Sequence, residues 1–133
     1  MKAIFLFLLL AGCASEYANI SDGPSAVPPS GAGLNGAGSS MAYDASKAGL
    51  IILTKDLARG LAPEVRVNAV APGVVDTAWT STWPTEHKQR AVERAVLKRI
   101  CTPQDIADVI VFLCVGTTMV TGQTIVIDGG ASL

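Results

Sequence analysis

The longest regular pattern of apolar residues runs from Ala42 to Leu61, where leucines recur every three or four positions. This spacing places them along one side of an α-helix, and Gly60 and Pro63 mark its end. We therefore expect one long helix over this range. Its sheet-facing stripe is expected to consist of Leu50, Leu53, Leu57 and Leu61.

Two short apolar runs, residues 65–71 and 124–128, predict buried strands. Between them, Thr102 and Pro103 suit the N-cap and first turn of another helix. The buried stripe of that helix is expected to comprise Ile106, Val109, Ile110 and Leu113.

Residues 79–99 are more polar. The part from Glu86 to Arg99 is rich in charge, with a few apolar residues interspersed, and predicts a solvated amphipathic helix. Trp79 and Trp83 either wall an apolar substrate or anchor the packing of a lid.

Tyr43 and Lys47 lie four residues apart at the start of the long helix, so both side chains share one helix face. An ammonium close to a phenol favours the phenolate and lowers the tyrosine pKa from about 10. Such a tyrosine can exchange a proton with an alcohol or carbonyl oxygen.

The Tyr43–Lys47 segment is followed by Asn-Ala-Val-Ala-Pro-Gly at residues 68–73 and by a strand that ends in Asp-Gly-Gly at residues 128–130. This ordered set resembles the C-terminal half of the short-chain dehydrogenases/reductases. The resemblance, from about Asn19 to Gly130, implies an α/β fold with a partial Rossmann-type doubly wound parallel sheet, formed by the last three strands and their helices. It also implies hydride transfer between NAD or NADP and a small-molecule alcohol or carbonyl substrate.

By this resemblance, Tyr43 is the general acid/base, and Lys47 lowers its pKa and binds the nicotinamide ribose. Pro72 and Gly73 form a rigid turn past the nicotinamide. Beyond the turn, the Val75 backbone meets the carboxamide, and the Thr77 hydroxyl contacts the carboxamide or a phosphate.

The catalytic serine is less clearly marked. Residues 16–22 resemble the family's fifth strand, in whose register Asp22 takes the serine position. Ser21 precedes it, and adjacent strand residues point to opposite faces, so Ser21 reaches the site only through a slip or bulge. Ser21 is our provisional choice as the carbonyl-polarising residue. The alternatives in the following loop are Ser25, Ser30, Ser39 and Ser40.

Residues 31–36 match the pattern G-x-G-x-x-G, and Asp56 lies twenty residues further on. A dinucleotide fingerprint needs a preceding strand and an acidic residue that ends a second strand. Pro28 and Pro29 precede this run, and Asp56 lies inside the expected helix. We therefore interpret residues 22–40 as an elongated loop on the substrate side, not as a dinucleotide site.

Family members are usually about twice as long, because the first half of the fold binds the dinucleotide. The glycine-rich turn, the residue that selects NAD or NADP and the helix with the catalytic asparagine have no counterpart here. The alternative to an enzyme is therefore a catalytically silent, truncated fragment. We expect the chain to bind NAD(H) or NADP(H) at millimolar levels or worse, with at most about 4 kcal/mol. An open sheet edge and the small residues of the 42–61 helix (Ala45, Ala48 and Gly49) favour a homo-oligomer.

The N-terminus has two interpretations. Residues 1–15 contain a short apolar run that ends in Leu10-Ala11-Gly12-Cys13, which resembles a lipobox. In one interpretation they are a signal segment that makes the chain a membrane-anchored lipoprotein, with residues 16–133 as a binding module or enzyme half. In the other, the start is mis-set, the segment belongs to the parent fold, and the protein is cytoplasmic.

Composition narrows the function further. The net charge of -1 shows no basic excess, so we expect no nucleic-acid partner. The three cysteines are widely spaced, and His87 is the single histidine, so we expect no metal site.

Overall fold

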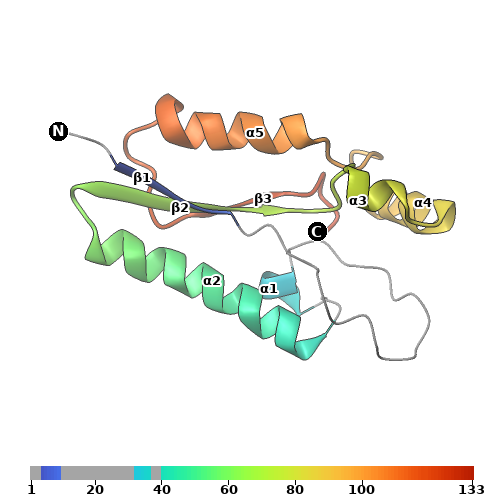
Figure 1. Ribbon diagram of the computed structural model, residues 1–133, viewed down its shortest axis with the longest axis horizontal. Coiled ribbons are helices and arrows are strands. Elements are labelled where there is room, and N and C mark those ends of the chain that lie inside the picture. The colour runs from blue at the N-terminus through green and yellow to red at the C-terminus, as the bar shows by residue number, and fades with distance from the viewer. Residues whose placement is uncertain (1–3, 10–31, 37–39) are drawn as a thin grey trace.

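The computed structural model describes residues 4–9, 32–36 and 40–133. Its elements alternate between strands and helices (Figure 1). In chain order they are β1 (Ile4–Leu9), α1 (Ala32–Asn35), α2 (Met41–Gly60), β2 (Val65–Pro72), α3 (Ala78–Ser81), α4 (Thr85–Arg94), α5 (Pro103–Val111), the π-helical turn η1 (Phe112–Gly116) and β3 (Thr124–Ile127).

The described strands form a parallel sheet in the order β1-β2-β3. The central strand β2 is buried continuously from Val67 to Pro72, as is usual for a parallel strand covered on both faces. The long helix α2 covers one face of the sheet and α5 covers the other (Figure 1). The predicted α/β fold with a parallel sheet is therefore confirmed.

The strand beside β2 is not the one that the sequence indicated. Residues 16–22, expected to form this strand, lie outside the described residues, as does the lipobox-like segment 10–13. In the structure β1 pairs with β2, from Ile4 opposite Val65 to Leu9 opposite Val70. Among the helices of the described residues, none is both long and apolar enough to cross a membrane.

The long helix forms as predicted, but the expected leucine stripe is only partly right. The buried residues of α2 are Lys47, Ile51, Thr54 and Ala58, whereas Leu53 is 43% exposed. Relative to the prediction, the buried side of the helix is thus shifted by about one residue. The β2 residue that packs against Ile51 is the small Ala69. Thr54 and Ala58 lie on the same buried side of the helix, and of the predicted leucines Leu50 packs against Ile51 and Ala69.

The helix α5 follows the prediction closely. Thr102 is its N-cap and forms a capping box with Asp105. Of the predicted stripe, Ile106 and Leu113 are buried, and Val109 and Ile110 pack against the same cluster.

At the far end of α5, Arg66 of β2 fixes η1 to the sheet. Its guanidinium donates hydrogen bonds to the carbonyl oxygens of Leu113 at 2.7 Å, Cys114 at 3.2 Å and Val120 at 2.9 Å. The bonds to Leu113 and Cys114 satisfy carbonyls at the end of the helix, which lack intrahelical partners, and the bond to Val120 holds the segment that follows it.

The predicted amphipathic helix ends earlier than expected. α4 stops at Arg94, and Ala95 is extended and only 2% exposed. The Leu97 N–H then donates to the Gly129 carbonyl at 3.0 Å. This contact turns the chain back toward the end of β3, so residues 95–99 form a turn instead of continuing the helix.

Leu113 offers a direct test of the core between α5 and the sheet. Its side chain is 1% exposed, so Leu113→Ala should lower the free energy of unfolding by about 2–5 kcal/mol. Leu97→Ala is the matched control, because Leu97 is 66% exposed and should change stability little. Urea unfolding followed by circular dichroism measures both. Equal losses in the two variants would contradict the packing described here.

Candidate active site

Tyr43 and Lys47 lie together in the first turns of α2. Ser40 caps the helix, and its hydroxyl accepts a hydrogen bond from the Tyr43 N–H at 3.2 Å. The Lys47 ammonium nitrogen lies 5.2 Å from the centre of the Tyr43 ring, and the Lys47 residue is 7% exposed. This distance is within the range of a cation–π contact. The structure therefore brings the predicted pair together.

The expected lowering of the Tyr43 pKa is not found. Burial raises the Tyr43 pKa above its ordinary value, and the negative charge of Asp44 raises it further. Both effects disfavour the phenolate, and Lys47, over the ring face, does not outweigh them. The phenol therefore holds its proton at neutral pH.

Sequence reasoning overlooked Asp44, which directly follows Tyr43. Asp44 is half-buried, and among the described residues its Oδ1 atom has no hydrogen-bond partner. A carboxylate directly next to a tyrosine in the first turn of a helix is the sequence signal that could have revealed it.

The turn after β2 lies at the carboxyl end of the strand, where the chain passes from Pro72 into α3. The Gly73 N–H donates to the Ile127 carbonyl at 2.8 Å. Further along, Val75 forms a parallel β-bridge with Cys101: the Cys101 N–H donates to the Val74 carbonyl at 2.9 Å, and the Asp76 N–H donates to the Cys101 carbonyl at 2.7 Å. The turn is thus held at both ends.

This bridge decides which way the Val75 backbone faces. Because its two hydrogen bonds use Val74 and Asp76, the N–H and carbonyl of Val75 point away from Cys101. The Val75 carbonyl accepts from the Thr80 hydroxyl at 2.9 Å. The Val75 N–H has no hydrogen bond to another described residue. A donor placed in this way suits the carbonyl oxygen of a ligand.

Thr77 begins α3 as its N-cap. Its hydroxyl accepts from the Thr80 N–H at 3.4 Å, a long contact, and lies 3.4 Å from the Thr80 hydroxyl. Thr77 is exposed, so its hydroxyl is accessible as well as being the cap.

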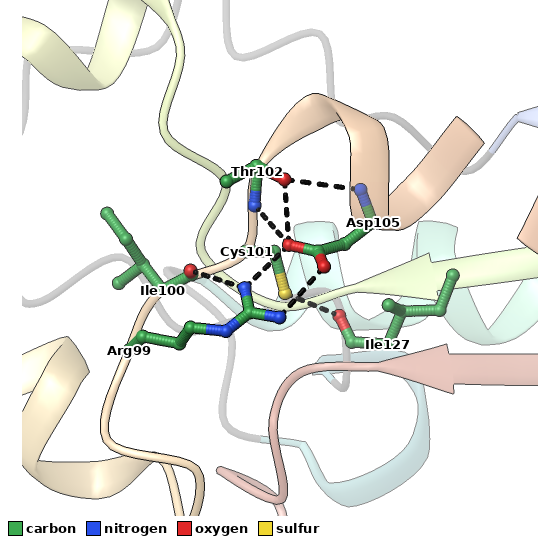
Figure 2. Close-up of polar contacts among 6 residues, drawn as sticks. All are labelled: Arg99, Ile100, Cys101, Thr102, Asp105 and Ile127. Carbon is green, nitrogen blue, oxygen red and sulfur yellow. Dashed lines mark hydrogen bonds and ion pairs between the residues drawn. The ribbon is translucent and has the colours of Figure 1, made fainter. Parts of the chain in front are cut away.

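A charged network supports the bridge partner Cys101 (Figure 2). Arg99 donates two hydrogen bonds to the Asp105 carboxylate at 2.6 and 2.8 Å, and the Thr102 N–H donates to the same carboxylate at 2.7 Å. These bonds, first of all those from Arg99, hold the pKa of Asp105 well below its usual value. Sequence reasoning did not identify this network, because Arg99 was assigned to a helix.

Cys101 itself is buried, and its thiol donates to the Ile127 carbonyl at 3.2 Å (Figure 2). Burial, together with the charge of Asp105, raises the pKa of this thiol. A neutral, hydrogen-bonded thiol of this kind suits a structural role beside the turn.

Of the candidate serines, only Ser40 lies among the described residues, and its hydroxyl is engaged as the N-cap of α2. Ser21, Ser25, Ser30 and Ser39 lie outside them. The structure therefore describes the Tyr43–Lys47 pair and the Pro72–Thr77 turn, and the assignment of Ser21 stays a prediction.

The glycine pattern at residues 31–36 is not part of a continuous loop as expected, because Ala32–Asn35 form the short helix α1. Within it, α1 lies against α2: a Cβ atom at Gly33 would come within 2.6 Å of the Lys47 carbonyl carbon. Asp56 is exposed on α2 and forms an ion pair with Arg59. Asp56 thus does not end a strand, as a dinucleotide fingerprint would require.

Trp79 and Trp83 pack edge to face, with ring centres 5.0 Å apart and an interplanar angle of 75°. Trp79 is half exposed. The contact joins α3 to the segment that leads into α4, and both roles considered for these residues remain compatible with it.

Comparisons with known proteins agree with this geometry. The sequence profile of a family described as Enoyl-(Acyl carrier protein) reductase matches residues 13–132. The chain is 45% identical over 103 residues to a short-chain dehydrogenase/reductase homologue, YusR, of Bacillus subtilis, covering 77% of this chain and 78% of the relative. It is 44% identical to the 3-oxoacyl-[acyl-carrier-protein] reductase FabG of Aquifex aeolicus, covering 66% of this chain and 36% of the relative.

A crystal structure of a short-chain dehydrogenase/reductase from Burkholderia xenovorans superposes with a TM-score of 0.71 at 35% identity, covering 98% of this chain and 42% of that one. The chain thus spans less than half the length of this protein and of the Aquifex relative, but more than three quarters of YusR. The matches in sequence and in structure agree, and the chain belongs to the short-chain dehydrogenase/reductase family.

Proposed function

We propose that this chain carries the proton-transfer and nicotinamide-facing part of an NAD(P)-dependent oxidoreductase that interconverts an alcohol and a ketone. The observation that carries the proposal is the Tyr43–Lys47 pair, with the ammonium 5.2 Å from the phenol ring. The helix α2 precedes β2 and runs antiparallel to it. The first turns of α2 therefore lie near the carboxyl ends of the strands, where ligands bind in open α/β sheets (Figure 1). Several relatives are named 3-oxoacyl-[acyl-carrier-protein] reductases, which supports a carbonyl substrate.

The described residues fit the nicotinamide end of a dinucleotide. The Val75 N–H faces away from its β-bridge and suits the carboxamide oxygen, and the exposed Thr77 hydroxyl lies two residues on. Lys47 is placed to bind the ribose hydroxyls beside Tyr43. When bound, a nicotinamide supplies or accepts the hydride.

Tyr43 handles the proton in this proposal. In the reduction of a ketone, the phenol donates its proton to the substrate oxygen as negative charge develops there. In the oxidation of an alcohol, the phenolate removes that proton. Since burial and Asp44 raise the Tyr43 pKa, the protonated form predominates at neutral pH and favours reduction. We keep Ser21 as the proposed carbonyl-polarising residue.

The second candidate is a catalytically silent fragment. It is favoured by the coverage of only 36% of the Aquifex aeolicus relative and 42% of the Burkholderia xenovorans protein. The two candidates differ in one property: whether the chemistry of Tyr43 appears once a complete dinucleotide site is supplied.

Tyr43→Phe tests this difference. In a chimaera, residues 1–133 of this chain, including β1, replace the C-terminal part of the Aquifex aeolicus relative, which this chain matches over 90 residues. Tyr43→Phe keeps the ring but removes the ionisable hydroxyl, so turnover of ketones with NADPH should fall by about 10²- to 10⁴-fold. Asp44→Asn should shift the pH profile of alcohol oxidation to lower pH, because it removes a charge that raises the Tyr43 pKa. Steady-state kinetics across pH measures both.

Asp56→Asn is the control, since it removes a carboxylate from the exposed side of the same helix. Ser21→Ala in the same chimaera tests the serine. A chimaera that reduces ketones equally well with Phe at position 43 would contradict the mechanism. A chimaera without any turnover, although it binds NADPH, would favour the silent fragment.

We also propose that two copies of this chain associate through α2. Its outer side carries Ile52, which is 55% exposed, and Leu53, which is 43% exposed. Gly49 lies between them on this side, and a Cβ atom there would meet nothing within 4 Å. This leaves room for a second helix to approach closely.

Gly49→Leu tests the association. The new side chain would project into open space in the single chain, so the monomer should keep or gain stability. At a close helix–helix contact it would overpack the interface by about 1–3 kcal/mol and raise the dimer dissociation constant about tenfold or more. Sedimentation equilibrium measures the constant, and a thermal melt of dilute protein is the control. An unchanged dissociation constant would place the contact elsewhere.

A further inference from the structure

One buried hydroxyl ties together the turn that follows β2. Thr80 is only 3% exposed, although the other residues of α3 are exposed. Its hydroxyl accepts a hydrogen bond from the Thr77 N–H at 2.8 Å and lies 2.9 Å from the Val75 carbonyl oxygen. Thr80 therefore contacts both of the residues that are proposed to face the nicotinamide.

The single proton of this hydroxyl has two acceptors within reach. The Thr77 carbonyl oxygen lies 3.0 Å away, but it already accepts from the Ser81 N–H at 2.9 Å. The Val75 carbonyl oxygen is closer, and no backbone N–H of the described residues donates to it. Because a half-buried carbonyl without a partner costs free energy, the proton is best used on Val75. The Val75 carbonyl thus depends on Thr80, whereas the Thr77 carbonyl does not.

These bonds decide which polar groups of the turn are left for a ligand. Thr80 takes up the Val75 carbonyl and the Thr77 N–H. The groups that remain are the Val75 N–H, which faces away from Cys101, and the exposed Thr77 hydroxyl, whose contact with the Thr80 N–H is long at 3.4 Å. The Val75 peptide groups are held by Cys101 on one side and by Thr80 on the other. The direction of the Val75 N–H is therefore set before a ligand binds.

We propose that Thr80 is a positioning residue of the nicotinamide site, whose hydroxyl holds Val75 so that the Val75 N–H stays available to the carboxamide oxygen of the cofactor. Thr80 acts through Val75 and Thr77, because its hydroxyl is used within the turn. A donor fixed in advance saves the cost of ordering the backbone when the ligand binds. The role toward the nicotinamide rests on the proposed function, whereas the fixing of the turn does not.

Thr80→Val and Thr80→Ser separate the hydroxyl from the rest of the side chain. Valine keeps the branched shape and removes the hydrogen-bonding oxygen, whereas serine keeps the oxygen. Thr82→Val is the matched control: the Thr82 hydroxyl donates to the Trp79 carbonyl at 2.9 Å at the end of the same helix, away from the turn. NMR signals of the buried β2 residue Val67 show whether each variant is folded.

The first measurement uses the 133-residue chain without a ligand. Thr80→Val removes the acceptor of the Thr77 N–H, so this proton should exchange with solvent about tenfold faster or more. The Val75 amide signal should shift, because its carbonyl is released. Thr80→Ser and Thr82→Val should leave both properties close to those of the parent chain. Unchanged exchange and an unchanged Val75 signal in Thr80→Val would overturn the fixing of the turn and would leave the proton chemistry of Tyr43 untouched.

The second measurement adds nicotinamide mononucleotide to the same chain, with adenosine monophosphate, which has no carboxamide, as the control ligand. We expect only the nicotinamide ligand to shift the Val75 amide signal. When binding is weak, the initial slope of this shift against ligand concentration is proportional to the association constant. The slope should fall about three- to tenfold in Thr80→Val, because one hydrogen bond to the ligand is misdirected, and should return in Thr80→Ser.

The outcomes separate a positioning role from a purely structural one. A less stable Thr80→Val chain with the slope of the parent would show that Thr80 only caps α3, and would overturn the proposal. Equal slopes for the two ligands, or no Val75 shift with either, would contradict the nicotinamide-facing turn as well. If Thr80→Val does not fold, Thr80→Ala is compared with Thr80→Ser in the same way. Neither measurement depends on turnover, so a failure of the proposed chemistry at Tyr43 is recognised separately in the chimaera.

Discussion

Burial of β2 on both faces is the constraint on which the rest of this structure depends. From Val67 to Pro72 every residue is buried, so each face of the strand needs a cover. Ala69 packs against α2, and Val70 packs against the cluster formed by α5 and β3. This arrangement places the start of α2 and the end of β2 at the same edge of the sheet (Figure 1).

The packing of α2 also sets the electrostatics of the candidate site. Lys47 belongs to the same buried stripe as Ile51, Thr54 and Ala58, so the contact that docks the helix also orients the ammonium. Tyr43 lies one turn earlier on that stripe and is half-buried. Burial therefore has two consequences: it fixes the pair, and it raises the Tyr43 pKa together with Asp44. Stability and proton chemistry are coupled in one helix face.

Features set by local sequence were predictable, whereas features set by distant partners were not. The N-cap at Thr102, with Pro103 in the first turn of α5, and the strand Val65–Pro72 follow from short patterns. The shift of the buried side of α2 depends on the small side chains of another strand, which the leucine spacing does not reveal.

The Val75–Cys101 bridge joins residues 26 positions apart, and the end of α4 depends on a bond from Leu97 to Gly129. The candidate site shows the same difference between local features and features set by distant residues. The Tyr43–Lys47 pair was found because it is local, while the direction of the Tyr43 pKa depended on burial that only the fold defines.

The central claim is that Tyr43 is a protonated, half-buried phenol whose pKa is raised by burial and by Asp44. A ¹³C NMR titration of tyrosine labelled at Cζ tests it directly, because the chain has two tyrosines and Tyr43→Phe assigns the signals. We predict a Tyr43 pKa above the ordinary value of about 10, lowered by Asp44→Asn and unchanged by Asp56→Asn. A Tyr43 pKa at or below about 10, or one that does not respond to Asp44→Asn, would contradict the account.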